Sequence, residues 1–285
     1  RKLGFTLKKT MSIAQALYEG IKIPEKGTVG LITYMRTDST RISEEARAMA
    51  KKYIVEEYGE NYYENRYYKT NKEAQDAHEG IRPTYADLKP DEIKDSLTKD
   101  QYKLYKLIYN RFMASQMSPA VYDTMSVTIE ANKYTFKASG QNLKFKGFMI
   151  LYVEGTDEKV VEENEIIPEL ELNQEVKKQN IEPQQSFTEP PARYTEASLV
   201  KALEEKGIGR PSTYSPTITT ILERRYIEKE QKQLMPTELG KVVNKLLTEN
   251  FTDIINVEFT ANIENQFDNI AEGKENWRDL IREFY

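Results

Sequence analysis

A tyrosine and an arginine stand two residues apart in a segment that favours an extended backbone. Tyr34 and Arg36 lie within residues 31–40, which continue with an aspartate, a serine and a threonine. In an extended chain, side chains two positions apart lie on one face, so the phenol and the guanidinium would reach the same place. A guanidinium holds the non-bridging oxygens of a phosphodiester while a neighbouring nucleophile attacks phosphorus. The spacing predicts this chemistry; the alternative is that Tyr34, one of 19 tyrosines, is a packing residue.

The sequence contains a single histidine, His78, four residues before Arg82. Histidine is readily protonated near neutral pH, so this pair would present positive charge to a nucleic-acid phosphate. A metal role is disfavoured, because histidine metal sites recruit several ligands and the nearby Asp76 and Glu79 have no recognised spacing. The alternative is an ordinary surface or capping histidine.

A glycine-containing turn followed by hydroxyl residues, residues 207–214, precedes a predicted helix. Hydroxyl and N–H groups at a helix N-terminus bind phosphates, arginine adds charge, and a tyrosine ring stacks on an unpaired base. The alternative is a tight turn with a helix cap. Two arginines at the end of the helix would contact DNA or compensate the helix dipole. The candidates are Arg210, Ser212, Thr213 and Tyr214 in the turn, and Arg224 and Arg225 at the helix end.

Composition limits the classes of protein that fit. The 285 residues are 39% hydrophobic and 31% charged, as in a globular protein of two or three domains. The lack of cysteine excludes a disulfide scaffold and fits the cytoplasm, where we expect the protein. No apolar run is long enough to span a membrane and no nucleotide-binding phosphate loop occurs, so neither a membrane nor ATP is an expected partner. The net charge is −5, but residues 1–41 carry +5, which predicts a basic surface near the N-terminus.

Helices and strands must position these residues. Alternating side chains on both sides of Asn132 predict a β-hairpin, and the acidic residues 154–175 are assigned no DNA contact. Apolar spacing and caps predict a helix at 10–18, a strand at 30–34, a helix from its cap Ser43 to Gly59, and a helix at 98–117 with a capping box of Thr98 and Gln101.

Paired prolines, Pro190 and Pro191, mark a boundary before a second group of helices. We expect a helix at 195–206, a turn, and a helix that Ser215 caps with Pro216 at its first position. A short two-stranded wing within 226–235 and a helix from Thr237 complete the outline of a winged helix.

Three stretches resemble motifs of the bacterial type IA DNA topoisomerases, of the topoisomerase I kind. Residues 31–40 (LITYMRTDST) resemble the active-site segment, and residues 77–84 (AHEGIRPT) resemble a second active-site motif. Residues 191–194 (PARY) through 210–214 (RPSTY) resemble the DNA-binding winged-helix segment, which adds Arg193 to the candidate DNA-binding residues. The order and spacing of all three match, and the resemblance covers essentially all 285 residues.

The resemblance implies ATP-independent relaxation of negatively supercoiled DNA. Tyr34 would form a 5′-phosphotyrosyl bond with one strand, Arg36 would steady the scissile phosphate, and His78 would contact it, with Arg82 nearby. Another strand would pass through the gap before the free 3′-hydroxyl reverses the reaction.

The resemblance also implies a mixed α and β, multidomain fold. A helical, winged-helix-like gate domain carrying Tyr34 would occupy residues 1–120, an antiparallel β arch residues 121–190, and a helical winged-helix-type domain that binds single-stranded DNA residues 191–285. Type IA enzymes use Mg²⁺ held by a Toprim domain that has no counterpart here, so no metal ligand is expected among these residues. We expect residues 1–285 alone to bind DNA as a monomer and to cleave it poorly.

Two alternatives stay open. Reverse gyrases contain a similar core, with their helicase half elsewhere in the chain. A noncatalytic winged-helix DNA-binding protein is the alternative from another class, with Tyr34 and His78 as structural residues. A DNA adduct on Tyr34 would distinguish an enzyme from such a protein.

Overall fold

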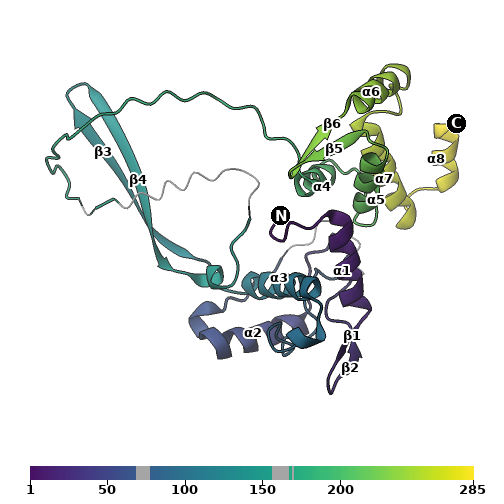
Figure 1. Ribbon diagram of the computed structural model, residues 1–285, viewed down its shortest axis with the longest axis horizontal. Helices are drawn as coiled ribbons and strands as arrows, with labels where there is room; N and C mark the ends of the chain where they lie inside the picture. The colour runs from purple at the N-terminus through teal and green to yellow at the C-terminus, as the bar shows by residue number, and fades with distance from the viewer. Residues whose placement is uncertain (69–77, 156–166, 169) are drawn as a thin grey trace.

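The computed structural model describes residues 1–68, 78–155, 167–168 and 170–285. It is a mixed α/β structure in which the described strands form three two-stranded antiparallel sheets. Figure 1 shows a helical N-terminal part, a long hairpin that extends away from it, and a second group of helices towards the C-terminus. Among the described residues, no helix combines the length and the apolar composition that crossing a bilayer requires.

The N-terminal part contains the main hydrophobic core. All residues of the buried cluster lie between Ala14 and Met117. Ser43 caps a helix as predicted, and the Thr98–Gln101 capping box forms with both of its hydrogen bonds. The elements of this part are α1 (Leu7–Glu19), β1 (Ile21–Ile23), β2 (Gly27–Val29), α2 (Glu44–Tyr58) and α3 (Lys99–Ser115), with single 3-10 turns at Glu60–Tyr62 and Lys94–Ser96.

The predicted strand at residues 30–34 is wrong. Among the described residues, this segment makes a single isolated antiparallel bridge, between Ile32 and Pro83; the β1–β2 hairpin just before it was not predicted. The segment has the apolar composition of a strand because Leu31 and Ile32 are buried in the core. A strand also needs a neighbour along its length, and here the neighbour makes one bridge only.

The predicted β-hairpin is confirmed, as β3 (Val121–Ala131) and β4 (Tyr134–Phe145). Asn132 adopts φ +54° in the turn, a conformation that asparagine tolerates better than most residues. Most of the hairpin side chains are exposed on both faces, and Figure 1 shows the hairpin standing apart from the helices. A 3-10 turn at Gly147–Ile150 joins it to the core.

The C-terminal part begins with two helices and a two-stranded antiparallel sheet in the predicted order; the winged-helix interpretation stays a prediction. One prediction is wrong: the second helix begins at Tyr214 after Thr213, so Ser215 lies inside it and is not its cap. The last two helices were not predicted. The elements are α4 (Glu196–Glu205), α5 (Tyr214–Glu223), β5 (Ile227–Glu230), β6 (Gln233–Pro236), α6 (Glu238–Asn250), α7 (Val257–Ala271) and α8 (Trp277–Phe284).

Helix α1 joins the two helical parts. Its first backbone N–H, at Leu7, donates a 2.6 Å hydrogen bond to the carboxylate of Glu196 at the start of α4. Lys229 of β5 pairs with the same carboxylate at 2.8 Å. The N-terminus of α1 therefore receives part of its capping from the C-terminal part.

Candidate functional site

The end of helix α1 fixes the backbone that leads to Tyr34. The N–H of Leu31 donates a 2.8 Å hydrogen bond to the carbonyl of Leu17, in the last turn of α1. Gly30, just before Leu31, passes very close to the end of α1. A Cβ at this position would lie 2.6 Å from the carbonyl oxygen of Tyr18. Only glycine permits this approach, and it places Tyr34 a short distance from the helix end.

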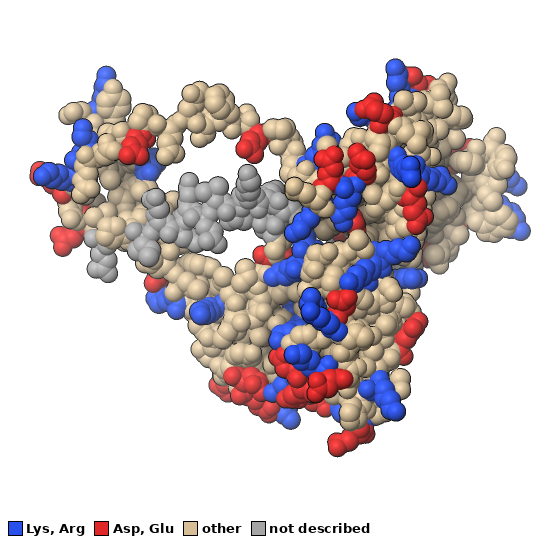
Figure 2. All heavy atoms as spheres, viewed as in Figure 1, with Lys and Arg blue, Asp and Glu red and all other residues tan. Residues whose placement is uncertain are grey.

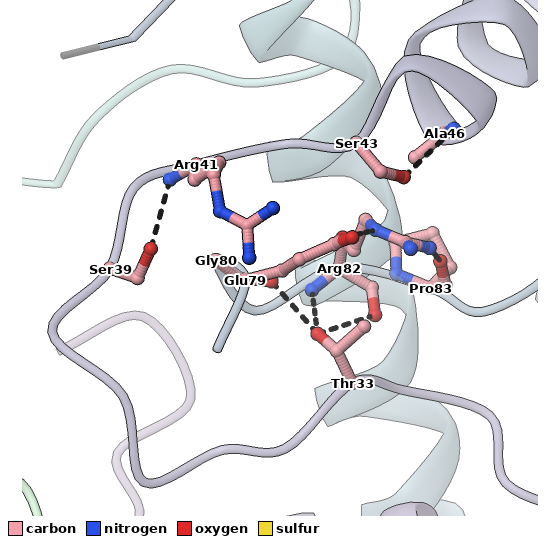
Figure 3. Close-up of polar contacts among 9 residues, drawn as sticks. All are labelled: Thr33, Ser39, Arg41, Ser43, Ala46, Glu79, Gly80, Arg82 and Pro83. Carbon is pink, nitrogen blue, oxygen red and sulfur yellow. Dashed lines mark hydrogen bonds and ion pairs between the residues drawn. The ribbon is translucent and has the colours of Figure 1, made fainter. Parts of the chain in front are cut away.

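A second segment, residues 80–84, holds the other side of the Tyr34 backbone. The N–H of Thr33 donates to the Arg82 carbonyl at 2.9 Å, and the N–H of Thr84 donates to the Leu31 carbonyl at 3.0 Å. The Thr33 hydroxyl donates to the Gly80 carbonyl at 2.8 Å and accepts from the Arg82 N–H at 3.0 Å (Figure 3). The two motifs that sequence analysis singled out are thus tied together by the backbone and by Thr33.

The rings of Tyr34 and His78 face one another. Their centroids are 5.1 Å apart and their planes differ by 32°. Tyr18 meets Tyr34 edge to face, with centroids 5.3 Å apart and planes at 62°. Tyr34 is half-buried against the core, and its hydroxyl makes no hydrogen bond within the described part of the chain. The phenol is therefore held by ring contacts and is not sealed in an apolar interior.

Arg36 is exposed, but the reason for pairing it with Tyr34 needs correction. The backbone bends at Met35 and Arg36, and Met35 turns into the core. The rule that residues two apart share a face applies to an extended strand and does not apply across this bend. The role of Arg36 as the group that holds the phosphate stays a prediction.

Arg82 has a partner inside the protein. Its Nε donates a 2.6 Å hydrogen bond to Glu79, and its Nη1 donates to the Pro83 carbonyl at 3.0 Å. The side chains of Arg82 and Glu79 are 12% and 20% exposed, so the pair is largely shielded from water. Burial alone would raise the pKa of Glu79, but Arg82 and hydrogen bonds with Ser43 hold it below the usual value of a glutamate. In this structure Arg82 shapes the 79–83 turn, and its contact with DNA stays a prediction.

The turn before α5 is closed by its own side chains. The Thr213 hydroxyl accepts a 2.8 Å hydrogen bond from the Arg210 N–H, and Gly209 adopts φ +76°. The Arg210 guanidinium pairs with Asp268 of α7 at 2.5 Å, with Glu264 at 3.9 Å. Ser212 is exposed.

Tyr214, at the first position of α5, is half-buried. Burial and the charge of Glu204 raise its pKa, and the charge of Asp38 adds to the increase. Helix α5 contacts α1, the helix whose last turn is bonded to the segment that leads to Tyr34.

The remaining predicted DNA-binding residues lie on the surface. Arg193, Arg224 and Arg225 are exposed. Arg193 also lines a mostly apolar pocket of about 600 Å³, together with Tyr194 and the side of α4 and α5. None of these three contacts Tyr34 through an interaction seen in the described residues, and their DNA contacts stay predictions.

The described residues contain no complete magnesium site. Within residues 1–68, 78–155, 167–168 and 170–285, no three histidine, aspartate or glutamate side chains gather closely enough to hold a metal ion. A Mg²⁺ site needs several oxygen ligands around one point. No catalytic step is assigned to magnesium here.

Sequence analysis missed three residues that shape the site. Thr33 bridges the two motifs, Glu79 holds Arg82, and Tyr18 contacts the ring of Tyr34. Glu79 could have been found as the charge three residues before Arg82. No local signal identifies Thr33 or Tyr18, because their partners lie 47 and 16 residues away along the chain.

The chain resembles known proteins in both sequence and fold. A family model described as DNA topoisomerase matches residues 1–282. Full-length topoisomerase I from Thermotoga maritima is 40% identical, with a TM-score of 0.81; the match covers 100% of this chain and 46% of that one. The chain thus spans about half the length of this relative. It belongs to the bacterial DNA topoisomerases, and within them to type IA.

Proposed function

We propose that this chain is the DNA-cleaving core of a type IA topoisomerase that relaxes negatively supercoiled DNA without ATP. The observation that carries the proposal is the position of Tyr34: half-buried, its ring against His78, at the junction of two segments that hydrogen bonds tie together. The family match over residues 1–282 supports it.

Tyr34 acts as the nucleophile in this proposal. The phenolic oxygen forms a bond to the phosphorus of one strand, the bond from phosphorus to the 3′-oxygen breaks, and that oxygen leaves as a 3′-hydroxyl. The reverse attack by the 3′-hydroxyl restores the strand after another strand has passed. One phosphodiester replaces another, so bond energy is retained and resealing requires no ATP.

The phenol loses its proton when it attacks phosphorus, and a neighbouring cation or base would assist that step. His78 faces the phenol and, when protonated, supplies positive charge to the phosphate. The guanidinium of Arg36 holds the non-bridging oxygens. Both groups favour the transition state, in which negative charge on the phosphate oxygens increases.

The three parts of the chain take separate roles in this proposal. Residues 1–120 form the gate domain that carries Tyr34, and residues 121–190 form the β arch. Residues 191–285 form a winged-helix-type domain that binds the single strand, with β5 and β6 as the wing. Figure 2 shows lysine and arginine side chains concentrated where the N-terminal and C-terminal helices meet, which favours the approach of DNA there.

Trapping the covalent adduct tests the proposal. The protein expressed from its complete reading frame is incubated with a labelled single-stranded oligonucleotide and Mg²⁺ and then denatured. We expect a DNA-linked protein band that Tyr34→Phe removes, because phenylalanine lacks the attacking oxygen. Tyr134→Phe, at the exposed hairpin turn, is the matched control and retains the band.

An adduct that persists in Tyr34→Phe would show that another residue is the nucleophile. The absence of any adduct in the unmodified protein, with DNA binding intact, would favour the noncatalytic alternative. In the same assay we expect residues 1–285 alone to bind the oligonucleotide but to form little adduct, since their described side chains provide no magnesium cluster.

A further inference from the structure

Tyr18 occupies a position that core packing alone does not explain. It lies in the last turn of α1, next to the fully buried Leu17, yet its own side chain is 41% exposed. Its ring meets Tyr34 edge to face with centroids 5.3 Å apart. Tyr18 thus contacts the predicted nucleophile and little of the core. Its role differs from that of the α1 residues that pack into the core.

We propose that Tyr18 is a positioning residue that holds the phenol of Tyr34 in its reactive orientation, an inference that rests on the proposed function. Edge-to-face contact is the favoured geometry for two aromatic rings, because the positive edge of one meets the negative face of the other. The Tyr34 ring also contacts His78, so two rings from different segments pack against it.

The backbone makes Tyr18 a stable support. The N–H of Gly20 donates to the Ala16 carbonyl and ends the helix, and the Leu31 N–H bonds to the Leu17 carbonyl. The close passage of Gly30 over the Tyr18 carbonyl fixes the distance between the helix end and the segment that leads to Tyr34. The position of the Tyr18 ring relative to Tyr34 therefore follows from backbone contacts on both sides.

The size of the effect follows from the restraint that is lost. The torsion that rotates a tyrosine ring is broad, so a neighbouring ring adds a preference that the phenol does not have by itself. A ring pair contributes enough to change an equilibrium between orientations by roughly threefold to tenfold. Nucleophilic attack depends steeply on orientation, so the loss appears in the rate of the chemical step.

The experiment compares Tyr18→Leu with Tyr18→Phe in the protein from the complete reading frame. Leucine retains helix propensity and apolar character but has no ring, whereas phenylalanine retains the ring. Adduct formation is followed in single-turnover reactions at saturating single-stranded oligonucleotide with Mg²⁺. Oligonucleotide affinity is measured by fluorescence anisotropy, and the melting temperature is recorded for each variant. Tyr134→Leu is the matched control.

We expect Tyr18→Leu to lower the rate constant of adduct formation by about threefold to tenfold, with the affinity and the melting temperature unchanged. Tyr18→Phe is expected to react at close to the normal rate. Should leucine destabilise the protein, Tyr18→Met provides a second non-aromatic variant with good helix propensity.

Three results would overturn the inference. A normal rate in Tyr18→Leu would show that the ring does not position Tyr34, and equal slowing by leucine and phenylalanine would assign the effect to the hydroxyl. A loss confined to affinity would make Tyr18 a DNA contact instead. Tyr34→Phe, run alongside, separates the two proposals: an adduct that survives it contradicts the proposed function, whatever the Tyr18 variants do.

Discussion

Two sets of tyrosines in the N-terminal part show how one residue type serves opposite purposes. Tyr105 and Tyr109 of α3 are buried, and their hydroxyls donate to the carbonyls of Leu88 and Ala86 at 2.8 and 2.6 Å. Burial raises the pKa of both phenols, which keeps them protonated. Tyr34 rests against the same core, but its hydroxyl has no hydrogen-bond partner in the described residues. A tyrosine that could act on a substrate is marked by an uncommitted hydroxyl at the edge of the core.

The two sets also differ in what holds them. Tyr105 and Tyr109 are fixed by a long helix and by the apolar groups packed around it. Tyr34 lies on a bridge between two loops, held by Thr33 and by the turn that the Glu79–Arg82 pair closes. Apolar burial is insensitive to pH, whereas a carboxylate–guanidinium pair is not. A change of pH should therefore loosen the Tyr34 site under conditions in which the apolar core stays folded.

The largest effect on stability is expected from the core. Tyr105→Ala leaves a cavity and removes the partner of the Leu88 carbonyl, so we expect a loss of about 3 to 5 kcal/mol in the free energy of unfolding. Tyr34→Phe should change that free energy by less than about 0.5 kcal/mol, because it removes a hydroxyl that has no hydrogen-bond partner among the described residues. Urea denaturation followed by circular dichroism measures both. Equal losses of unfolding free energy in Tyr105→Ala and Tyr34→Phe would contradict the distinction between buried, bonded tyrosines and Tyr34.

A smaller effect is expected from the turn beside the site. The pKa of Glu79 is lowered in the folded state, so its contribution to stability is present above the pKa of an unfolded glutamate, about 4.3, and is lost as the pH falls through the folded value. Glu79→Gln should cost about 1 to 2 kcal/mol at pH 7 and less as the pH approaches 3. Denaturation midpoints across this range provide the measurement. A constant difference between pH 7 and pH 3 would argue against the ion pair as the source.

The smallest effect is expected on DNA binding. Like the tyrosines, the arginines fall into two sets, those paired within the protein and those exposed. Arg210 pairs with Asp268, whereas Arg224 is exposed. If Arg224 contacts phosphate, Arg224→Ala should weaken binding to single strands of any sequence by a few-fold and reduce the salt dependence of the affinity by about one charge. Arg278→Ala, an exposed arginine of α8 outside the predicted site, is the control. Fluorescence titrations at several salt concentrations measure the slope, and an unaltered slope in Arg224→Ala would remove that residue from the interface.

Local signals in the sequence were enough to predict several elements. Ser43 and Thr98 cap helices because their side chains accept hydrogen bonds from N–H groups three residues ahead, an arrangement that needs no distant partner. Asn132 marked the hairpin turn for a similar reason. The three motifs likewise led to the family through residues that lie close together in the chain.

Contacts between distant segments escaped prediction. The strand expected at residues 30–34 failed because, in the described part of the chain, it forms a single β-bridge, to Pro83 some fifty residues later. The start of α5 was misplaced because Arg210 and Thr213 form a turn ahead of Ser215, which was the better cap by type alone. The ring contacts of Tyr34 with Tyr18 and His78 depend on the same long-range packing. Sequence analysis therefore selected Tyr34 as a candidate nucleophile but did not predict the contacts that hold it.

The carboxylate of Glu196 has a consequence for how the protein unfolds. It belongs to α4, yet it satisfies the first N–H of α1 and pairs with Lys229. Melting the C-terminal helices would expose the beginning of α1 and loosen the helix whose other end adjoins Tyr34. We therefore expect the two helical parts to unfold in one cooperative transition. A destabilising substitution in the C-terminal part would then disturb Tyr34 by fraying α1.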